Sequence, residues 1–219
     1  MSSIINIINK MHDTSIKNVT LFIETYVQNE NKTVVEIGSK GYQGQFTFRD
    51  LLPNNINFIG VDFQEGYNVD VVLDDPYKIP LEDNSVDYVI SSSCFEHSEF
   101  FWLSFLEVMR ILKPNGIFYL NAPSNGVFHR YPVDCWRFFP DSGLALSKWS
   151  KRNGIDCELL EQYTSLKEND IWLDHVSVFI KSLDTSNFPK NRILDSFKNF
   201  KNGTIFPNHE EYLNSNFND

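Results

Sequence analysis

Apolar residues in this 219-residue chain fall into short runs with two different spacings. Continuous runs rich in Val and Ile predict strands that are buried on both faces of a parallel sheet. These strands are expected at 33–37, 57–62, 69–73, 86–91 and 117–121. Other segments repeat apolar residues every three or four positions, which predicts amphipathic helices. We expect the helices at 3–28, 46–52, 100–112 and 144–152.

Two further strands are expected late in the chain, at 156–163 and 174–182, without a strong helix between them. Such a pair is typical of an antiparallel hairpin at a sheet edge. The pattern therefore predicts an α/β fold, a Rossmann-like seven-stranded, mostly parallel sheet with an antiparallel last strand and helices on both faces. We divide the chain into a helical segment (1–30), one main domain (31–183) and a polar tail (184–219) that docks loosely or contacts a second copy of the chain.

The charge and cysteine content limit which binding partners and which cellular compartment we expect for the protein. Lys and Arg total 19 against 29 Asp and Glu, for a formal charge of −10. A protein that binds nucleic acid mainly through phosphates is basic, so we expect no nucleic-acid partner. No run approaches the roughly 18 apolar residues that span a membrane, and the N-terminus lacks the pattern of a secretory signal. The three cysteines lack CxxC spacing, so we predict neither disulfides nor a metal site, and a cytoplasmic protein.

The most informative motif is the glycine-rich stretch VVEIGSKGYQG at 34–44, directly after the first predicted strand. Glycines at this point let the backbone turn tightly and approach a ligand closely. Asp62 ends the next strand, 24 residues after Gly38, where a carboxylate can accept both hydroxyls of a ribose. The motif and the carboxylate together predict a nucleotide-type cofactor site.

Two carboxylate positions separate the cofactors that share this geometry. Glu36 lies two residues before Gly38, where it would repel a pyrophosphate but would tolerate or favour a cationic sulfonium and ammonium ligand. Asp74 and Asp75 follow the third strand, where a carboxylate can accept the amino group of adenine. This combination favours S-adenosylmethionine over a dinucleotide.

With these motifs, about residues 33–182 resemble the class I S-adenosylmethionine-dependent methyltransferases, of the type 11-like kind. The resemblance rests on VVEIGSKGYQG, IGVD, LDDPYKIPLEDNSVDYVISSSCFEH, the helix that leads to LKPNG, and IFYLNAP. It implies S-adenosyl-L-methionine as the cofactor. It also implies that the cofactor is bound by Glu36, Gly38, Ser39, Gly41, Asp62, Phe63, Asp74, Asp75, Ser91 and Ser92.

The resemblance implies that these residues contact different parts of the cofactor. Glu36 belongs with the glycines at the methionine end, and Asp62 belongs at the ribose. Either Asp74 or Asp75 meets the adenine amine, and both registers stay open. The family often has Gly where this chain has Lys40, and Pro76 lacks the backbone N–H that often meets the adenine ring.

The long connection at 121–143 follows the fifth predicted strand, at the sheet edge where open α/β folds bind ligands. We predict that it forms the acceptor pocket, with arginines for a phosphate or carboxylate and aromatics that stack on a sugar or enclose an amine. Its candidate residues are His129, Arg130, Tyr131, Asp134, Trp136 and Arg137. The alternative is structural: Arg137 pairs with Asp134 or Asp141, and Trp136 fills core.

Three histidines are candidates for the acceptor side of the site. His129 is the first candidate general base, which would remove a hydroxyl proton as the methyl group arrives. His97 is its rival, because it follows the fourth strand near the expected sulfonium. His175 begins an antiparallel last strand and would return to the same edge, where it could bind substrate.

The segments SSSCFEH and HRYPVDCWRFFPDSG are also loosely similar to methyltransferases associated with bacterial surface-polysaccharide biosynthesis. This similarity implies O-methylation of a sugar or N-methylation of a small amine, on an acceptor that is phosphorylated or linked to a nucleotide. The alternatives are a nucleotide-dependent oxidoreductase or epimerase, for which Tyr163 and Lys167 form a YxxxK pattern, and a non-catalytic cofactor-binding scaffold. Neither explains both Glu36 and the polar loop.

Overall fold

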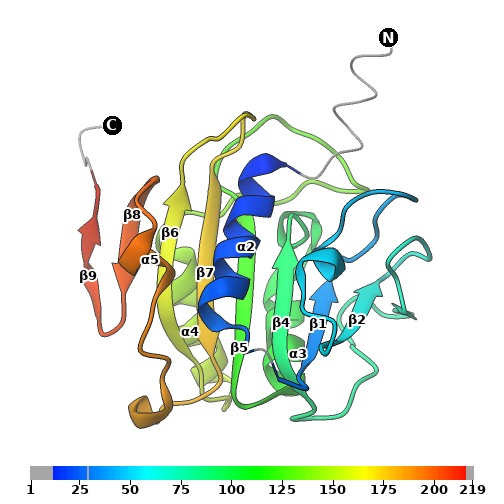
Figure 1. Ribbon diagram of the computed structural model, residues 1–219, viewed down its shortest axis with the longest axis horizontal. Helices are drawn as coiled ribbons and strands as arrows, with labels where there is room; N and C mark the ends of the chain where they lie inside the picture. Colours follow the sequence, from blue (N-terminus) through cyan, green and yellow to red (C-terminus); the bar gives the residue numbers. More distant parts are fainter. Residues whose placement is uncertain (1–11, 29, 216–219) are drawn as a thin grey trace.

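Nine strands form one mixed sheet in the computed structural model, which describes residues 12–28 and 30–215 (Figure 1). The strand order is β3-β2-β1-β4-β5-β7-β6-β8-β9. The strands are β1 (Thr33–Ile37), β2 (Asn57–Asp62), β3 (Val71–Val72), β4 (Val86–Ser92), β5 (Leu112–Pro123), β6 (Glu158–Ser165), β7 (Asp174–Ile180), β8 (Phe200–Ile205) and β9 (Asn208–Leu213).

The sheet has a parallel half and an antiparallel half. Strands β3, β2, β1, β4 and β5 pair in parallel, whereas β5, β7, β6, β8 and β9 pair antiparallel to one another. The α/β Rossmann-like prediction and the antiparallel pairing of the two late strands are confirmed, but the expectation of seven strands with the antiparallel strand as the last is wrong. The difference arises because β8 and β9 extend the sheet beyond β6, each antiparallel to its neighbour.

Helices cover both faces of the sheet. The four α-helices of the described residues are α2 (Asp13–Tyr26), α3 (Phe101–Ile111), α4 (Ser142–Arg152) and α5 (Ile193–Ser196). Side chains of α2 and α5 pack in the core of one face, and those of α3 and α4 in the core of the other (Figure 1). The part of the first expected helix before residue 12 lies outside the described residues. The helix expected at 46–52 is a short 3-10 turn, η1 (Phe48–Leu51).

A buried polar network fixes α2 to the strand ends that carry the site. The amide of Asn18 donates to Asn121 on β5 at 3.2 Å. The Asn121 amide in turn donates to Asp174 on β7 at 3.0 Å and to Ser92 on β4 at 3.1 Å. Burial raises the pKa of Asp174 to about 6. Because buried polar groups are costly unless they are paired, this network sets how α2 sits on the sheet.

The segment predicted as a polar tail contributes to the sheet instead. Residues 185–213 form η3 (Thr185–Asn187), α5, β8 and β9. The buried carboxylate of Glu161 accepts the N–H groups of Ile193 and Leu194 at the start of α5, at 2.8 and 3.0 Å, and also the hydroxyl of Tyr26. The end of the described chain is therefore anchored to both α2 and the central sheet.

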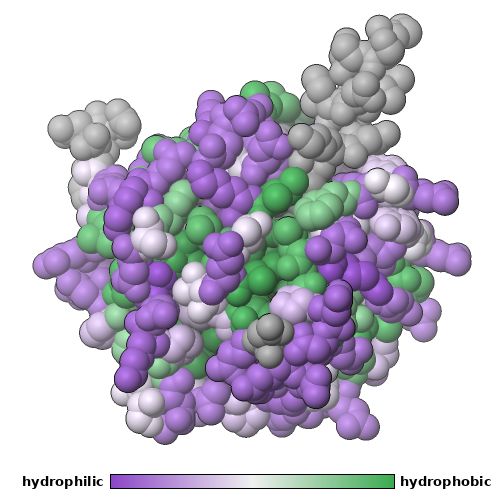
Figure 2. All heavy atoms as spheres, viewed as in Figure 1, coloured by the Kyte–Doolittle hydropathy of each residue, from purple (hydrophilic) through white to green (hydrophobic). Residues whose placement is uncertain are grey.

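The surface of the α2 face is mixed. Figure 2 shows apolar side chains gathered near the middle of this face, with hydrophilic side chains around them. Partly buried residues of α2, such as Leu21 and Ile23, pack there against the core. Among the described residues, no helix is both long and apolar enough to cross a membrane.

Candidate active site

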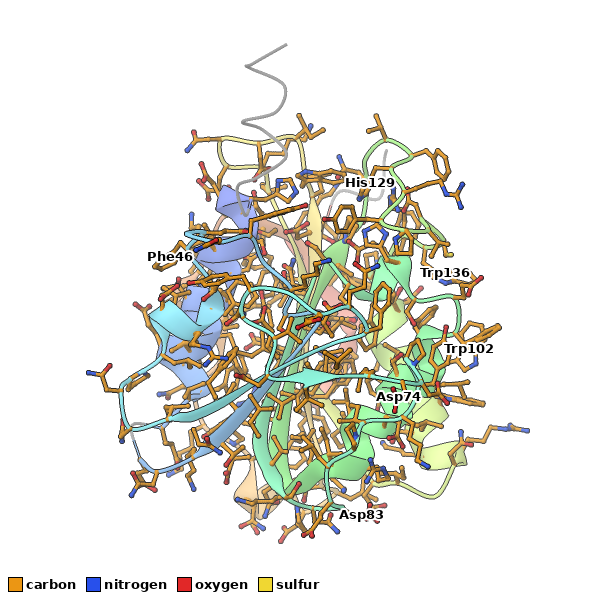
Figure 3. All side chains as sticks on the ribbon, turned by 90° about the vertical axis from the view of Figure 1, so that its right-hand side faces the viewer. Phe46, Asp74, Asp83, Trp102, His129 and Trp136 are labelled. Carbon is orange, nitrogen blue, oxygen red and sulfur yellow. The ribbon has the colours of Figure 1, made fainter. Side chains whose placement is uncertain are left out.

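A cavity of about 600 Å³ opens at the carboxyl ends of the parallel strands. Its wall combines the turn after β1, the end of β2, the loop after β4 and residues 130–133. Ligands of open α/β sheets bind at this edge, and the volume lies within the usual range of small-molecule sites. Figure 3 shows His129 and Trp136 toward this end of the molecule and Asp83 at the opposite end.

The turn after β1 depends on Gly38. Its φ is +78°, a conformation that residues with a side chain adopt rarely. A β-carbon at this position would lie 2.6 Å from both Cβ and Sγ of Cys94, in the loop after β4. The N–H of Gly38 donates to the carbonyl of Val61 at 2.9 Å, which ties the turn to β2. Glycine thus lets two walls of the cavity approach each other.

Asp62 and Phe63 line the cavity at the end of β2. The carboxylate of Asp62 accepts the N–H of Lys40 at 3.1 Å and the N–H of Gln64 at 2.9 Å. These two bonds use part of the acceptor capacity of a carboxylate, which has about four lone-pair sites. Asp62 is therefore fixed in place and can accept further hydrogen bonds from a ligand.

Glu36, Ser39 and Gly41 lie behind the cavity wall. Glu36 is buried, accepts a hydrogen bond from the amide of Asn68 at 3.1 Å, and has its pKa raised to about 8 by burial. The hydroxyl of Ser39 is buried without a hydrogen-bond partner among the described residues. Gly41 donates its N–H to the carbonyl of Tyr67 at 3.0 Å. These three residues shape the turn, whereas Ile37, Gly38 and Lys40 of the same stretch line the cavity.

The segment after β3 borders the cavity through Leu73, Pro76 and Tyr77. The two predicted adenine acceptors, Asp74 and Asp75, lie between these residues and are exposed. The carboxylate of Asp75 accepts the N–H of Tyr77 at 2.9 Å. Asp75 therefore has a local structural role.

At the end of β4 the structure shifts the serine assignment by one residue. The Ser91 hydroxyl donates to the carbonyl of Ile37 at 3.2 Å, and Ser92 belongs to the network under α2, where its hydroxyl lies 2.7 Å from that of Ser15. Ser93, at φ +51°, is the serine that lines the cavity. Ser93 follows the last residue of β4 at a positive φ, so its side chain no longer obeys the alternation that places Ser91 and Ser92 on opposite faces.

The three candidate histidines occupy different positions. His97, in η2 (Phe95–His97), lines the cavity, and burial lowers its pKa. One of its ring nitrogens, Nδ1, lies at the carbonyl of Val133. His129 lies behind His97 with the two ring centres 5.0 Å apart. His175 is 1% exposed on β7 and contacts Ser177, so it lies outside the cavity lining and does not meet the acceptor there.

The connection predicted as the substrate loop divides into cavity residues and supporting residues. Arg130 and Tyr131 line the cavity. The Tyr131 hydroxyl contacts that of Tyr42, which links this loop to the glycine-rich turn. Asp134 and Arg137 instead form an ion pair with N–O distances of 2.6 and 2.9 Å, and this pair holds the pKa of Asp134 well below its usual range. The structural alternative for Arg137 is thus the observed one.

Trp136 fastens the loop to α3. Its indole N–H donates to the carbonyl of Ser98 at 3.0 Å, and its ring packs edge-on against Phe101 and Trp102. It lies outside the cavity lining. Six cavity residues were not predicted from the sequence, although four of them lie within the quoted motifs: Lys40, Gln64, Tyr77, Ser93, Cys94 and Glu99.

The fold is Rossmann-like, and its cavity lies at the sheet edge where open α/β folds bind ligands. Residues 34–120 match the family model of a methyltransferase domain. A search of curated proteins gave no match. The matching segment contains the glycine turn, Asp62 and the loop after β4, which all contribute to the cavity wall.

Solved structures of similar fold include several methyltransferases. One belongs to a complex that contains the Haloferax volcanii Trm112 methyltransferase activator; it is 19% identical, with a TM-score of 0.55, and the match covers 78% of this chain and 90% of that chain. An Aquifex aeolicus S-adenosylmethionine-dependent methyltransferase is 16% identical, with a TM-score of 0.53 and coverages of 82% and 98%.

A third structure is the Burkholderia thailandensis 1,6-didemethyltoxoflavin-N1-methyltransferase, with bound 1,6-didemethyltoxoflavin and S-adenosylhomocysteine. It is 13% identical, with a TM-score of 0.57 and coverages of 78% and 80%. At these identities the similarity is one of fold. Together with the methyltransferase-domain match, it supports a methyltransferase whose cofactor is S-adenosylmethionine.

Proposed function

We propose that this protein transfers a methyl group from S-adenosylmethionine to a small, polar, anionic acceptor. The observation that carries the proposal is one cavity whose wall joins Gly38 and Asp62 of the glycine-turn region to His97, Arg130 and Tyr131. Bound S-adenosylmethionine supplies the methyl group on a sulfonium. The chain itself binds both reactants, orients them and keeps water from the reacting atoms.

The residues at the β1 and β2 ends fit the cofactor. Asp62 is fixed by two backbone N–H groups and keeps acceptor capacity for ribose hydroxyls, and Phe63 offers an aromatic face beside it. Asp75 already accepts the N–H of Tyr77, so we propose Asp74 as the acceptor of the adenine amine, with the N–H of residue 75 beside it. Glu36 keeps its proposed role at the methionine end, although Asn68 now bonds its carboxylate.

His97 is the residue we place next to the reacting atom of the acceptor. Burial keeps its imidazole neutral near pH 7. A proton on Nδ1, donated to the Val133 carbonyl, leaves the lone pair on Nε2. His129 acts from behind His97, at a ring separation of 5.0 Å. Loss of either imidazole should therefore slow methyl transfer and leave cofactor binding intact.

Arg130 is the observation that favours an anionic acceptor. It lines the cavity, and its Nε donates to the carbonyl of Pro132 at 3.1 Å. Its guanidinium is suited to a phosphate or carboxylate, and Tyr131 beside it offers a ring for a sugar. With the looser resemblance to surface-polysaccharide methyltransferases, this favours a phosphorylated or nucleotide-linked sugar or small amine as the acceptor. In this proposal Arg137 and His175 do not bind the acceptor directly, because Arg137 pairs with Asp134 and His175 is buried.

The test has two parts. Calorimetry with S-adenosylmethionine, S-adenosylhomocysteine and NAD checks the cofactor; binding of NAD alone would contradict the proposal. Mass spectrometry then screens phosphorylated and nucleotide-linked sugars and amines for the gain of one methyl group. Arg130→Ala should raise the KM for the acceptor and leave cofactor affinity unchanged, with Arg152→Ala on the distant helix α4 as the matched control.

A further inference from the structure

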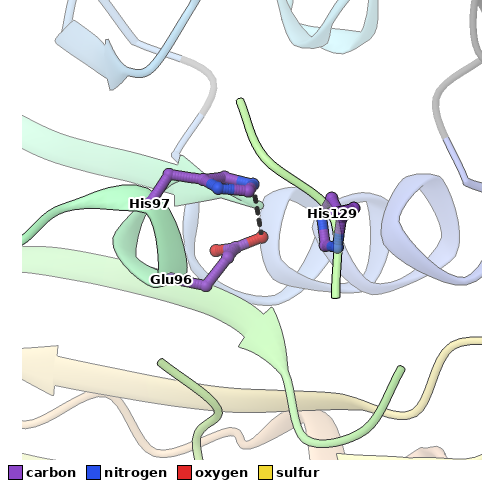
Figure 4. Close-up of side chains that lie close together, drawn as sticks. All are labelled: Glu96, His97 and His129. Carbon is purple, nitrogen blue, oxygen red and sulfur yellow. Dashed lines mark ion pairs between the residues drawn. The ribbon is translucent and has the colours of Figure 1, made fainter. Parts of the chain in front are cut away.

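Three metal-ligating side chains meet beside the cavity. Glu96 and His97 come from η2 after β4, and His129 comes from the loop after β5. One ligand atom from each of the three lies within 4.8 Å of the other two. Figure 4 shows the Glu96 carboxylate directed between the two imidazole rings. We call these residues the Glu96–His97–His129 cluster.

The carboxylate of this cluster lacks the partners that a buried carboxylate normally has. Glu96 is 1% exposed, and its Oε2 has no hydrogen-bond partner among the described residues. Its other oxygen, Oε1, lies 3.7 Å from Nε2 of His97, which is longer than a hydrogen bond. Burying a carboxylate oxygen without a partner is costly, so this oxygen has acceptor capacity for a ligand from outside the chain.

The two imidazoles are held as metal ligands usually are. A ligating histidine generally donates its second ring N–H to a carbonyl or carboxylate, which fixes its tautomer and orientation. Nδ1 of His97 lies at the carbonyl of Val133, which leaves Nε2 to face Glu96. Nδ1 of His129 lies 3.1 Å from the carbonyl of Val127 and 3.5 Å from Asp134.

The support extends one layer further. Asp134 accepts the backbone N–H of His129 at 2.7 Å and is itself held by Arg137. The carbonyl of Glu96 accepts the N–H groups of Cys135 and Trp136, at 2.9 and 3.1 Å. The loop that carries His129 is thereby fastened to the turn that carries Glu96 and His97. The Arg137–Asp134 ion pair and Trp136 therefore both help to hold His129 near Glu96 and His97.

We propose that Glu96, His97 and His129 bind one divalent transition-metal ion at the wall of the cavity. Two imidazoles and one carboxylate suit Zn²⁺, Fe²⁺ or Mn²⁺ and leave coordination positions open. Tetrahedral ligands about 2.0–2.2 Å from zinc lie about 3.4 Å apart, so Glu96 and His97, at 3.7 Å, are near this spacing, whereas a pair as far apart as 4.8 Å must close by about 1.4 Å. Cysteine spacing does not indicate this site, because its ligands are two histidines and a carboxylate.

This inference rests on the proposed methyltransferase function and assigns the cluster a role in it. Because His97 lines the cavity, an acceptor hydroxyl can take an open position on the ion. With the ion bound, Nε2 of His97 would be a metal ligand and no longer a base, and the ion would lower the pKa of that hydroxyl so that its proton passes to water. The oxygen then forms a bond to the methyl carbon, the bond from that carbon to sulfur breaks, and its electron pair stays on sulfur to give S-adenosylhomocysteine.

The test measures metal binding directly. Protein stripped with a chelator is titrated with Zn²⁺ by calorimetry and with Co²⁺ by visible absorption. We expect one equivalent to bind to the wild type. His97→Ala and His129→Ala should each weaken binding by more than about 10–100-fold. His209→Gln is the control, because His209 lies on the edge strand β9, where it contacts Thr204 and the Leu159 carbonyl, and its loss should leave binding unchanged.

The outcomes separate this inference from the proposed function. His129→Ala should still bind S-adenosylmethionine, which shows that the variant is folded. If the wild type binds no stoichiometric metal, or if neither histidine variant weakens binding, the metal site is refuted, and methyl transfer in the presence of chelator would still uphold the proposed function. If metal binds at the cluster but S-adenosylmethionine does not bind, the metal site stands and the proposed function fails.

Discussion

The side chain of Cys94 occupies the space in which a β-carbon of residue 38 would lie, at 2.6 Å from that position. Two loops that are far apart in the sequence therefore meet at Gly38 without room for another atom. Contacts this short force the backbone to shift, since protein interiors are packed to crystal-like density. The part of the cavity wall that Gly38 and Cys94 share depends on this contact.

Gly38→Ala should lower both stability and cofactor affinity. The substitution combines a strained φ of +78° with the contact to Cys94, which together should cost about 2–4 kcal/mol. Thermal unfolding and calorimetry with S-adenosylmethionine measure the two effects. Gly154→Ala is a matched control, because Gly154 has the same φ of +78° but a β-carbon there would meet no atom within 4 Å. Equal losses in the two variants would argue against the contact.

Asp62→Ala should weaken cofactor binding by about 1.5–3 kcal/mol, the range for a hydrogen bond to a charged group. The carboxylate is 8% exposed and lines the cavity. Calorimetry with S-adenosylhomocysteine is the measurement, and Asp156→Ala, an exposed carboxylate on the other side of the molecule, is the control. An unchanged affinity would remove the ribose assignment.

Glu36 should make stability depend on pH. Its pKa is raised from 4.5 to about 8 by burial, so the folded protein holds a proton there that the unfolded chain loses. Stability should therefore fall as pH rises from 4.5 toward 8 and should level off above the folded pKa. The slope is at most about 1.4 kcal/mol per pH unit. Urea unfolding at about pH 6 and about pH 8 should show a smaller decline in Glu36→Gln, and equal declines would contradict the buried-acid assignment.

Arg137→Gln should loosen the loop around His129. It leaves the Asp134 carboxylate, whose side chain is 2% exposed, without its cation. Hydrogen exchange of residues 127–137 should become faster, and Asp134→Asn in the same chain should recover part of the protection. Arg49→Gln is the control, because its ion pair with Asp70 is about 40% exposed on both sides (42% and 43%) and should contribute under about 1 kcal/mol.

The parallel half of the fold could be predicted because its signals are local. Strands β1, β2 and β4 read as short apolar runs that end in glycine, aspartate or serine. The end of the chain could not be predicted in this way. The residues of β8 and β9 are polar and rich in Asn and Glu, and their pairing depends on distant partners such as Glu161. No local pattern encodes a long-range contact of this kind.

The sequence predicted where in the fold the candidate site lies better than it predicted the role of each residue there. The glycine turn and Asp62 follow from their places at strand ends. Which of the three histidines reaches the cavity depends on loop geometry. His97 lines the cavity, His129 lies behind His97, and His175 is buried in the sheet. The proposed metal-binding role of Glu96 could not be predicted from the sequence, because the burial of its Oε2 without a hydrogen-bond partner is a property of the tertiary structure.

The network that joins Asn18 to Asn121 limits how far the enzyme can be reduced to a minimal fragment. The segment that matches the methyltransferase-domain model begins at residue 34, after α2 has ended. Removal of α2 would expose the fully buried ring of Tyr119 and deprive Asn121 of its donor. A recombinant fragment that begins at residue 34 and keeps the rest of the chain is therefore expected to be insoluble, and truncation studies should retain the chain from the start of α2.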